Sequence, residues 1–216
     1  MVENQNLLKN IQNQNMILLL SLLLFLLDTH YYILKKNIIL NDAYDVIANI
    51  WKYLINATPE QINNLPNMQR GDTIKDLQNI SQVEKDLLGF MVNRGVPYPH
   101  FVYTTWACEG NEINKVKQRI LENLPKIRHW NVLCESYEKL ENIEATWFID
   151  PPYQNGGDRY IKNQIDYSYL SEWCKSRNGQ VIVCENSDAN WLDFKPLTMC
   201  HGQKKRTLEV IWTKEN

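Results

Sequence analysis

The sequence is short of glycine at its start, has no marked charge of either sign and has no paired cysteines. No glycine precedes Gly71, which excludes a tight glycine-rich loop from the first part of the chain. The 23 lysines and arginines nearly balance the 25 acidic residues, for a formal net charge of −2. The net charge therefore does not indicate a nucleic-acid partner, although a local basic patch would suffice to bind one.

The five cysteines are an odd number and include no Cys-x-x-Cys pair. Neither a zinc site nor a disulfide framework is indicated, and we expect small buried thiols in a reducing cytoplasm. The 216 residues, 44% of them hydrophobic, suit one domain or one domain with an insertion. We expect a cytoplasmic protein without a metal site or an obligate protein partner.

An apolar run from Met16 to Leu27 follows a polar start and ends at Asp28. As a helix it would span about 18 Å, short of the roughly 30 Å hydrocarbon core of a membrane. We therefore expect a buried leucine-rich helix inside an atypical N-terminal segment, residues 1–35. A membrane anchor is the less favoured alternative, because residues 31–34 would lengthen the apolar stretch. A signal peptide fits less well, since the leading segment is barely basic.

The most informative stretch is Ala145 to Tyr153, with the sequence ATWFIDPPY. Its first five residues predict a buried strand, which Pro151 and Pro152 end. Asp150 then lies at the carboxyl end of the strand, where α/β sheets bind their ligands. The Asp150 carboxylate and the Pro151 carbonyl can accept the two hydrogens of a planar amino group, while Tyr153 stacks on its ring. The amine of a base flipped out of a helix is such a ligand.

This stretch resembles the Asp-Pro-Pro-Tyr catalytic motif of amino methyltransferases that act on adenine-N6 of DNA. With residues 134–140 before it, the chain looks like the Dam-type adenine methylases. The resemblance implies a Rossmann-like S-adenosylmethionine-dependent methyltransferase fold and double-stranded DNA as partner. It makes Asp150, Pro151, Pro152 and Tyr153 the catalytic residues. Because short motifs arise by chance, the alternative is a proline-ended strand with a solvent-exposed Asp150.

Three acidic or hydroxyl residues are expected to contact the cofactor S-adenosylmethionine. Residues 37–40 predict a strand that ends in Asn41 and Asp42, and an acid at that place binds ribose hydroxyls in Rossmann-like folds. Asp42 can also cap the next helix, and the two roles are compatible. A strand over residues 130–134 leads to Ser136, where the resemblance places a contact with the cofactor adenine. A helix cap is the alternative for Ser136, and Asp150 completes the expected contacts.

The predicted catalytic core comprises residues 36–56 and 129–216, with a helical insertion over residues 57–128. Apolar spacing predicts helices over residues 43–56, 81–93 and 112–124, and Thr58-Pro59 predicts a helix start. Dam-type enzymes carry their target-recognition segment at the position of this insertion. Its basic residues, among them Lys117 and Arg128, would contact phosphates; a solvated helix face is the alternative.

The chain after the motif supplies the remaining expected DNA contacts. The loop 154–160 contains Gly156-Gly157 and can close over a flipped base, with Tyr160 as an extra wall. A helix over residues 166–177 and strands at 181–185, 198–200 and 208–212 complete the layout. The turn between the last two strands carries Lys204, Lys205 and Arg206, which would follow a phosphate backbone. An exposed charged turn is the alternative.

The predicted reaction is therefore transfer of a methyl group from S-adenosylmethionine to adenine-N6 of DNA. Dam-type enzymes carry a Phe-x-Gly-x-Gly loop after the first strand, and this chain lacks it. The lack leaves a second hypothesis, an inactive relic from a truncated or frame-shifted copy that still binds nucleic acid. A third hypothesis is a methyltransferase for an RNA or protein amino group.

Overall fold

A computed structural model describes residues 15–19, 37–69, 71–92, 96–102, 112–201 and 206–215. These residues form a mixed α/β fold around one seven-stranded sheet, with strand order β3-β2-β1-β4-β5-β7-β6. Within the described strands, β7 alone runs antiparallel to both of its neighbours, and the other pairs are parallel. A mostly parallel sheet of this kind is compatible with the expected Rossmann-like fold.

The strands and helices follow the predicted layout closely from residue 37 onward. The strands are β1 (Asn15–Leu19), β2 (Asn37–Asn41), β3 (Asn131–Leu133), β4 (Ala145–Ile149), β5 (Gly179–Asn186), β6 (Lys195–His201) and β7 (Arg206–Lys214). The α-helices are α3 (Asp45–Asn56), α4 (Pro59–Asn63), α5 (Gln82–Met91), α6 (Glu112–Ile127) and α7 (Tyr167–Ser176). Three short 3-10 helices are η2 (Ile74–Asp76), η3 (Tyr137–Lys139) and η4 (Gly157–Arg159).

The N-terminal prediction is wrong where it can be compared with the structure. Met16 begins no helix; it lies in β1, an interior strand of the sheet, opposite Ile38 of β2 and Thr146 of β4. Met16 and Ile17 are both buried, and they join different hydrophobic clusters because successive strand residues face opposite sides of a sheet. A strand buried on both faces is apolar throughout, so its composition does not distinguish it from a buried helix. Residues 20–36 lie outside the described part.

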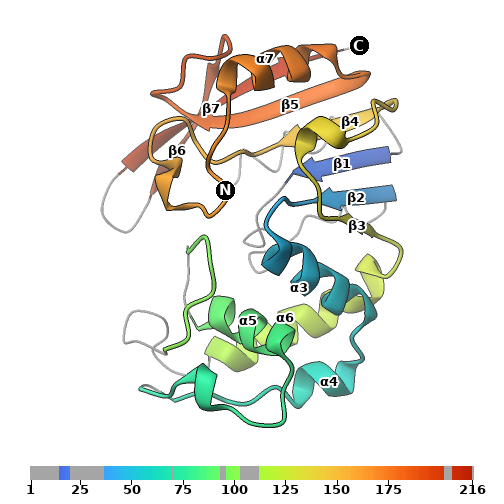
Figure 1. The fold of residues 1–216 in the computed structure, drawn as a ribbon, viewed down its shortest axis with the longest axis vertical. Helices are drawn as coiled ribbons and strands as arrows, with labels where there is room; N and C mark the ends of the chain where they lie inside the picture. The colour runs from blue at the N-terminus through green and yellow to red at the C-terminus, as the bar shows by residue number, and fades with distance from the viewer. Residues whose placement is uncertain are drawn as a thin grey trace.

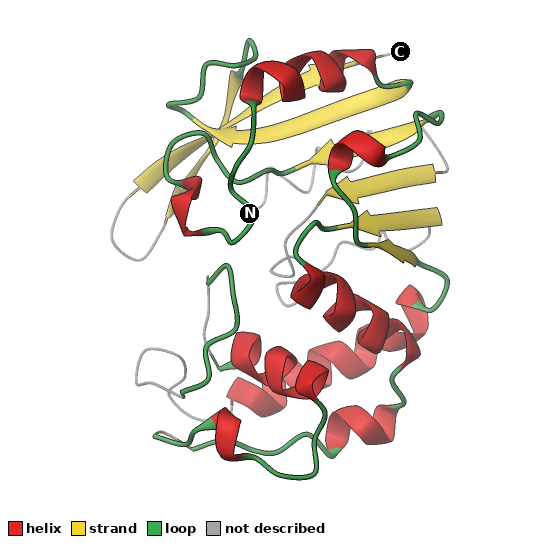
Figure 2. Ribbon diagram, viewed as in Figure 1, coloured by secondary structure: helices red, strands yellow, loops and turns green. Residues whose placement is uncertain are grey.

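Helices cover the sheet unequally (Figure 2), with α3, α4, α5 and α6 gathered at one end of the molecule and α7 lying over the other part of the sheet. Helix α3 buries Ile47, Ile50, Trp51 and Leu54, spaced as an amphipathic helix requires. Capping boxes at Thr58 and Ser81 begin α4 and α5. The helices predicted for residues 43–56, 81–93 and 112–124 are confirmed.

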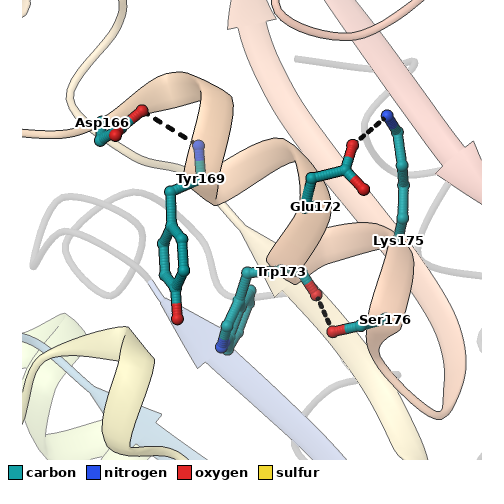
Figure 3. A network of polar contacts seen from close by, with 6 residues as sticks. All are labelled: Asp166, Tyr169, Glu172, Trp173, Lys175 and Ser176. Carbon is teal, nitrogen blue, oxygen red and sulfur yellow. Dashed lines mark hydrogen bonds and ion pairs between the residues drawn. The ribbon is translucent and has the colours of Figure 1, made fainter.

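Helix α7 is fixed to the sheet through its aromatic face (Figure 3). Asp166 begins the helix by accepting from the Tyr169 backbone N–H at 3.0 Å. Trp173 packs edge-on against Trp147 of β4, with ring centroids 5.5 Å apart. Glu172 and Lys175, on the exposed side, form an ion pair at 2.8 Å. Packing of tryptophan on tryptophan therefore locks β4, the strand that leads to Asp150, beneath this helix.

Two basic side chains of the insertion are used inside the fold. Lys117 is buried, and its ammonium donates to Asn67 Oδ1 at 3.0 Å and to the Leu65 carbonyl. Burial lowers the pKa of Lys117. The Arg128 guanidinium donates to the Ala57 carbonyl just after α3. Both groups satisfy carbonyls beyond helix C-termini, and the expected phosphate contact is wrong for the buried Lys117.

We expect Gly179→Ala to lower the free energy of unfolding by about 3 kcal/mol or more. Gly179 begins β5 with φ of +90°, and a Cβ there would lie 2.2 Å from the Ala145 carbonyl oxygen. Gly71→Ala is the matched control, since Gly71 has φ of +93° but nothing within 4 Å of its Cβ position. It should lose only about 1 kcal/mol. Urea unfolding measures both, and equal losses would contradict a close approach of β5 to β4.

Candidate functional site

The candidate site lies where the parallel strands end. The arrowheads of β1, β2 and β4 point to the same side of the sheet (Figure 1), and the loop after β4 begins there. Asp42 follows β2, Asp150 follows β4 and Glu185 lies near the end of β5. Because these strands are parallel, the fold brings three carboxylates from distant parts of the chain to one sheet edge.

The segment Asp150 to Tyr153 is held by its own loop and by α7. Tyr167, at the start of α7, donates from its hydroxyl to the Pro152 carbonyl at 2.6 Å. The Gly157 N–H donates to the Tyr153 carbonyl at 3.0 Å, which closes a turn back onto the motif. A Cβ at Gly157 would lie 2.9 Å from the Pro152 carbonyl carbon, so the returning backbone lies directly against the motif. The motif is therefore a stiff, supported turn.

Asp150 keeps its acceptor groups available. Among the described residues, nothing donates to the Asp150 carboxylate or to the Pro151 carbonyl. Asp150 is largely shielded from water, and burial, followed by the charges of Glu209 and Glu185, raises its pKa to about 7. A solvent-exposed aspartate, the alternative to a site residue, would not be perturbed in this way. The two acceptors predicted to take an amino group are thus both present and unpaired with a protein donor in the described part.

Tyr153 is anchored at the far end of its ring. Its hydroxyl donates to Glu209 Oε2 of β7 at 2.7 Å. Burial, together with the charges of Asp150 and Glu209, raises the pKa of Tyr153, so the phenol stays protonated and remains the donor. Tyr153 is half-buried beside Asp150, which is the arrangement the motif predicts for an aromatic plate next to an acceptor.

Glu185 belongs to this edge, although the sequence analysis did not predict it as a site residue. It is fully buried, and its carboxylate accepts from the Gln154 N–H at 2.7 Å, the Trp191 indole N–H at 3.0 Å and the Asn186 N–H at 2.9 Å. It fixes the backbone directly after Tyr153. The strand ending Glu185-Asn186 was visible in the sequence, but its link to the motif loop joins residues 31 apart and has no local signature.

Asp42 lies where a ribose acid is expected, though not as a helix cap. Helix α3 has Tyr44 at its N-cap position, and Asp42 accepts from the Tyr44 N–H at 2.8 Å in the turn before it. The helix-cap prediction for Asp42 is therefore wrong. Burial raises the pKa of Asp42 to about 6, with the Tyr44 hydrogen bond acting against the shift. Next to it, the Asn41 side chain bonds to both the N–H and the carbonyl of Glu135, which ties β2 to the end of β3.

Ser136 lies beside this tie and does not cap a helix. It precedes the 3-10 helix η3, and its hydroxyl makes no cap hydrogen bond. Instead it donates to Glu138 Oε2 at 2.9 Å. The helix-cap alternative is wrong for Ser136, and a contact with a cofactor adenine stays a prediction.

Tyr160 lies close to the acidic edge, and its role as an extra wall of the site stays a prediction. Its side chain is 40% exposed, and burial followed by the charges of Asp150, Asp42 and Glu209 raises its pKa. The Tyr160 hydroxyl thus lies within range of the charges of three carboxylates that come from different parts of the sheet. The predicted basic turn is only partly within the described residues: Lys204 and Lys205 lie outside them. Arg206 begins β7 opposite His201.

Comparisons with protein-family models and with curated proteins both give no match. In the described ranges, no group of three or more His, Cys, Asp and Glu side chains could hold a metal ion. None of the helices described here has the length and apolar character needed to cross a membrane. Buried thiols are confirmed for Cys174 and Cys184, whereas Cys134 is exposed.

We expect Asp150→Asn to stabilise the protein more at pH 8 than at pH 5. The folded pKa of Asp150, about 7, lies above its ordinary 3.8, so its favourable contribution is present below pH 3.8 and is lost as the pH rises through 7. The neutral amide escapes this loss, which the shift puts at roughly 4 kcal/mol at pH 8 and at less than half of that at pH 5. Thermal unfolding at both pH values measures it, with Asp193→Asn on the exposed surface as control. An equal effect at both pH values would disprove the shifted titration.

Proposed function

We propose that the protein is an adenine-specific DNA methyltransferase, which transfers a methyl group from S-adenosylmethionine to adenine-N6. The observation that carries the proposal is the pair of open acceptors, Asp150 and the Pro151 carbonyl, beside the anchored ring of Tyr153. Both acceptors point to a ligand that donates two hydrogens from one nitrogen, and the ring points to a planar ligand. An exocyclic base amine has both properties.

The sheet supports the same proposal. The resemblance implies a closing antiparallel pair at the end of a parallel sheet, and β7 runs antiparallel to both β5 and β6. The motif strand β4 is the central strand of the seven and pairs in parallel with β1. In such sheets, ligands bind where the strand order reverses, and the order here reverses between β1 and β4.

The residues that would hold the cofactor fit it in part. Asp42 accepts through Oδ1 from Tyr44 and keeps Oδ2 for a ribose hydroxyl. S-adenosylmethionine, when bound, supplies an electrophilic methyl group. The chain's own residues bind and orient the amine. Asp150 and the Pro151 carbonyl accept its two hydrogens, which orients the nitrogen lone pair toward the methyl carbon, and Tyr153 stacks on the base. Preorganised acceptors also stabilise the positive charge that develops on nitrogen.

The methylated nitrogen must then lose one proton, and the Asp150 carboxylate is the group placed to take it. A carboxyl with a pKa of about 7 is ionised often enough near neutral pH to accept hydrogen bonds and is basic enough to accept a proton. An ordinary aspartate would be a much weaker base. The burial that makes Asp150 costly to ionise therefore matches its proposed role.

A second candidate is a protein that keeps this site but cannot bind the cofactor. It is favoured by one observation: no glycine occurs between β1 and Gly71, so the close backbone approach made by Dam-type enzymes has no glycine to provide it. Isothermal titration with S-adenosylmethionine separates the candidates. Binding heat that Asp42→Asn weakens about tenfold or more would support the enzyme, whereas no heat at millimolar ligand would support the second candidate.

We expect tritiated methyl groups from S-adenosylmethionine to enter DNA and to appear as N6-methyladenine. Asp150→Ala should reduce the rate at least about 100-fold, because it removes an acceptor aimed at the reacting nitrogen. Asp193→Asn serves as the surface control. RNA and a protein mixture are offered in parallel; label that enters only one of these would refute DNA as the substrate.

We also expect the rate constant at saturating substrate to fall about tenfold for each pH unit below 7 and to level off above it. The reason is that protonation of Asp150, with its pKa of about 7, removes the acceptor and base. A pH–rate profile between pH 5 and 9 measures this. A profile that stays flat down to pH 5 would exclude Asp150 as the titrating group.

A further inference from the structure

Glu209 reaches the candidate site from the far end of the chain. It lies near the start of β7 and pairs with Asn186 of β5. Because β7 runs antiparallel to β5, the beginning of β7 meets the end of β5, at the edge where Asp150 lies. The fold therefore places on this edge a carboxylate that is 56 residues away from Tyr153 in the sequence.

The contact between Glu209 and Tyr153 fixes the orientation of the ring. The hydroxyl donates to Glu209 Oε2 at 2.7 Å, a length typical of a strong hydrogen bond to a carboxylate. At the other end of the residue, Glu185 holds the next peptide through the Gln154 N–H. A tyrosine held at its backbone and at its hydroxyl cannot rotate about its Cα–Cβ bond without breaking one of these contacts. Its ring face is thus positioned before any ligand arrives.

Glu209 also faces the other polar groups of this edge. Its charge contributes to the raised pKa values of Asp150, Tyr160 and Cys184. The groups around Asp150 come from each neighbouring element: Glu209 from β7, Cys184 and Glu185 from β5, and Tyr153 and Tyr160 from the loop after β4. Both described charges that act on Asp150, those of Glu209 and Glu185, are negative.

We propose that Glu209 is a positioning residue of the methyl-transfer site, which holds Tyr153 as a base-stacking plate and acts on Asp150 through its charge. This inference rests on the proposed function and assigns to β7 a part in it. The two effects are separable. The hydrogen bond sets where the base lies, and the charge sets the pH at which Asp150 becomes a carboxylate.

Two variants separate these effects. Glu209→Gln keeps an acceptor for the Tyr153 hydroxyl but removes the charge. Tyr153→Phe keeps the charge but removes the hydrogen bond. Glu172→Gln, on the exposed side of α7, is the matched control. The Asp150 carboxyl is followed by carbon NMR of protein labelled with ¹³C-aspartate, and the signal is assigned by its loss in Asp150→Asn.

We expect the Asp150 titration midpoint to fall by roughly 0.5 to 1 pH unit in Glu209→Gln and to stay unchanged in the other two variants. The acidic limb of the pH–rate profile should move by the same amount. In Tyr153→Phe the KM for poly(dA-dT) duplex should rise several-fold, with the pH limb unmoved. A midpoint that does not move in Glu209→Gln, or that moves equally in Tyr153→Phe, would overturn the proposal.

Failure of the proposed function gives a different result. If the wild-type protein transfers no methyl group to any substrate, the enzyme assignment fails, while the NMR midpoints still decide whether Glu209 acts on Asp150. If Glu209→Gln changes only the unfolding temperature and leaves both the midpoint and the pH limb in place, Glu209 is merely structural and the inference is wrong.

Discussion

The structure depends on one unfavourable arrangement, a shielded carboxylate at the end of β4 with two more carboxylates near it. Desolvation and like charges both oppose ionisation of Asp150, and its pKa rises to about 7. A folded protein tolerates such a free-energy cost where the surrounding packing fixes the position of the side chain. Here that packing is specific: Trp147 of β4 is locked under Trp173, and Pro151 and Pro152 stiffen the turn that follows. The packing of the sheet therefore offsets the free-energy cost of a shielded carboxylate at this edge.

The interior strands of the sheet supply that stability. Strand β1 pairs on both sides, with β2 and β4, and its buried Met16 and Ile17 serve the two hydrophobic clusters on opposite faces. The reversed strand β7 adds a carboxylate to this edge, because its antiparallel direction brings Glu209 to the same edge as Asp150. The site is therefore assembled from strand ends rather than from one continuous motif, which allows distant residues to meet on a rigid support.

Local signals in the sequence sufficed for much of this arrangement. Five apolar or strand-favouring residues before Asp150 predicted β4, and proline and cap residues predicted the helix start at Thr58. These signals failed at Met16, because a strand buried on both faces shows no alternation of apolar and polar residues by which it could be recognised. They also missed Glu185 and Glu209, whose roles come from hydrogen bonds to residues 31 and 56 positions away. Sequence patterns report what neighbours in the chain do, and these contacts depend on strand pairing.

An acidic edge is poorly suited to a polyanion, and in the proposed function base flipping would resolve the conflict. Carboxylates at Asp42, Asp150 and Glu185 would repel phosphates brought close to them. A flipped base projects away from its backbone, so only an uncharged ring with a hydrogen-bond-donating amine has to enter. Phosphate contacts must then come from other parts of the chain, at distances where screening by salt weakens the repulsion. The acceptors at the site also favour an amine over a carbonyl group as the ligand. A carbonyl oxygen would face acceptor oxygens there, and an ionised Asp150 offers it no hydrogen-bond donor.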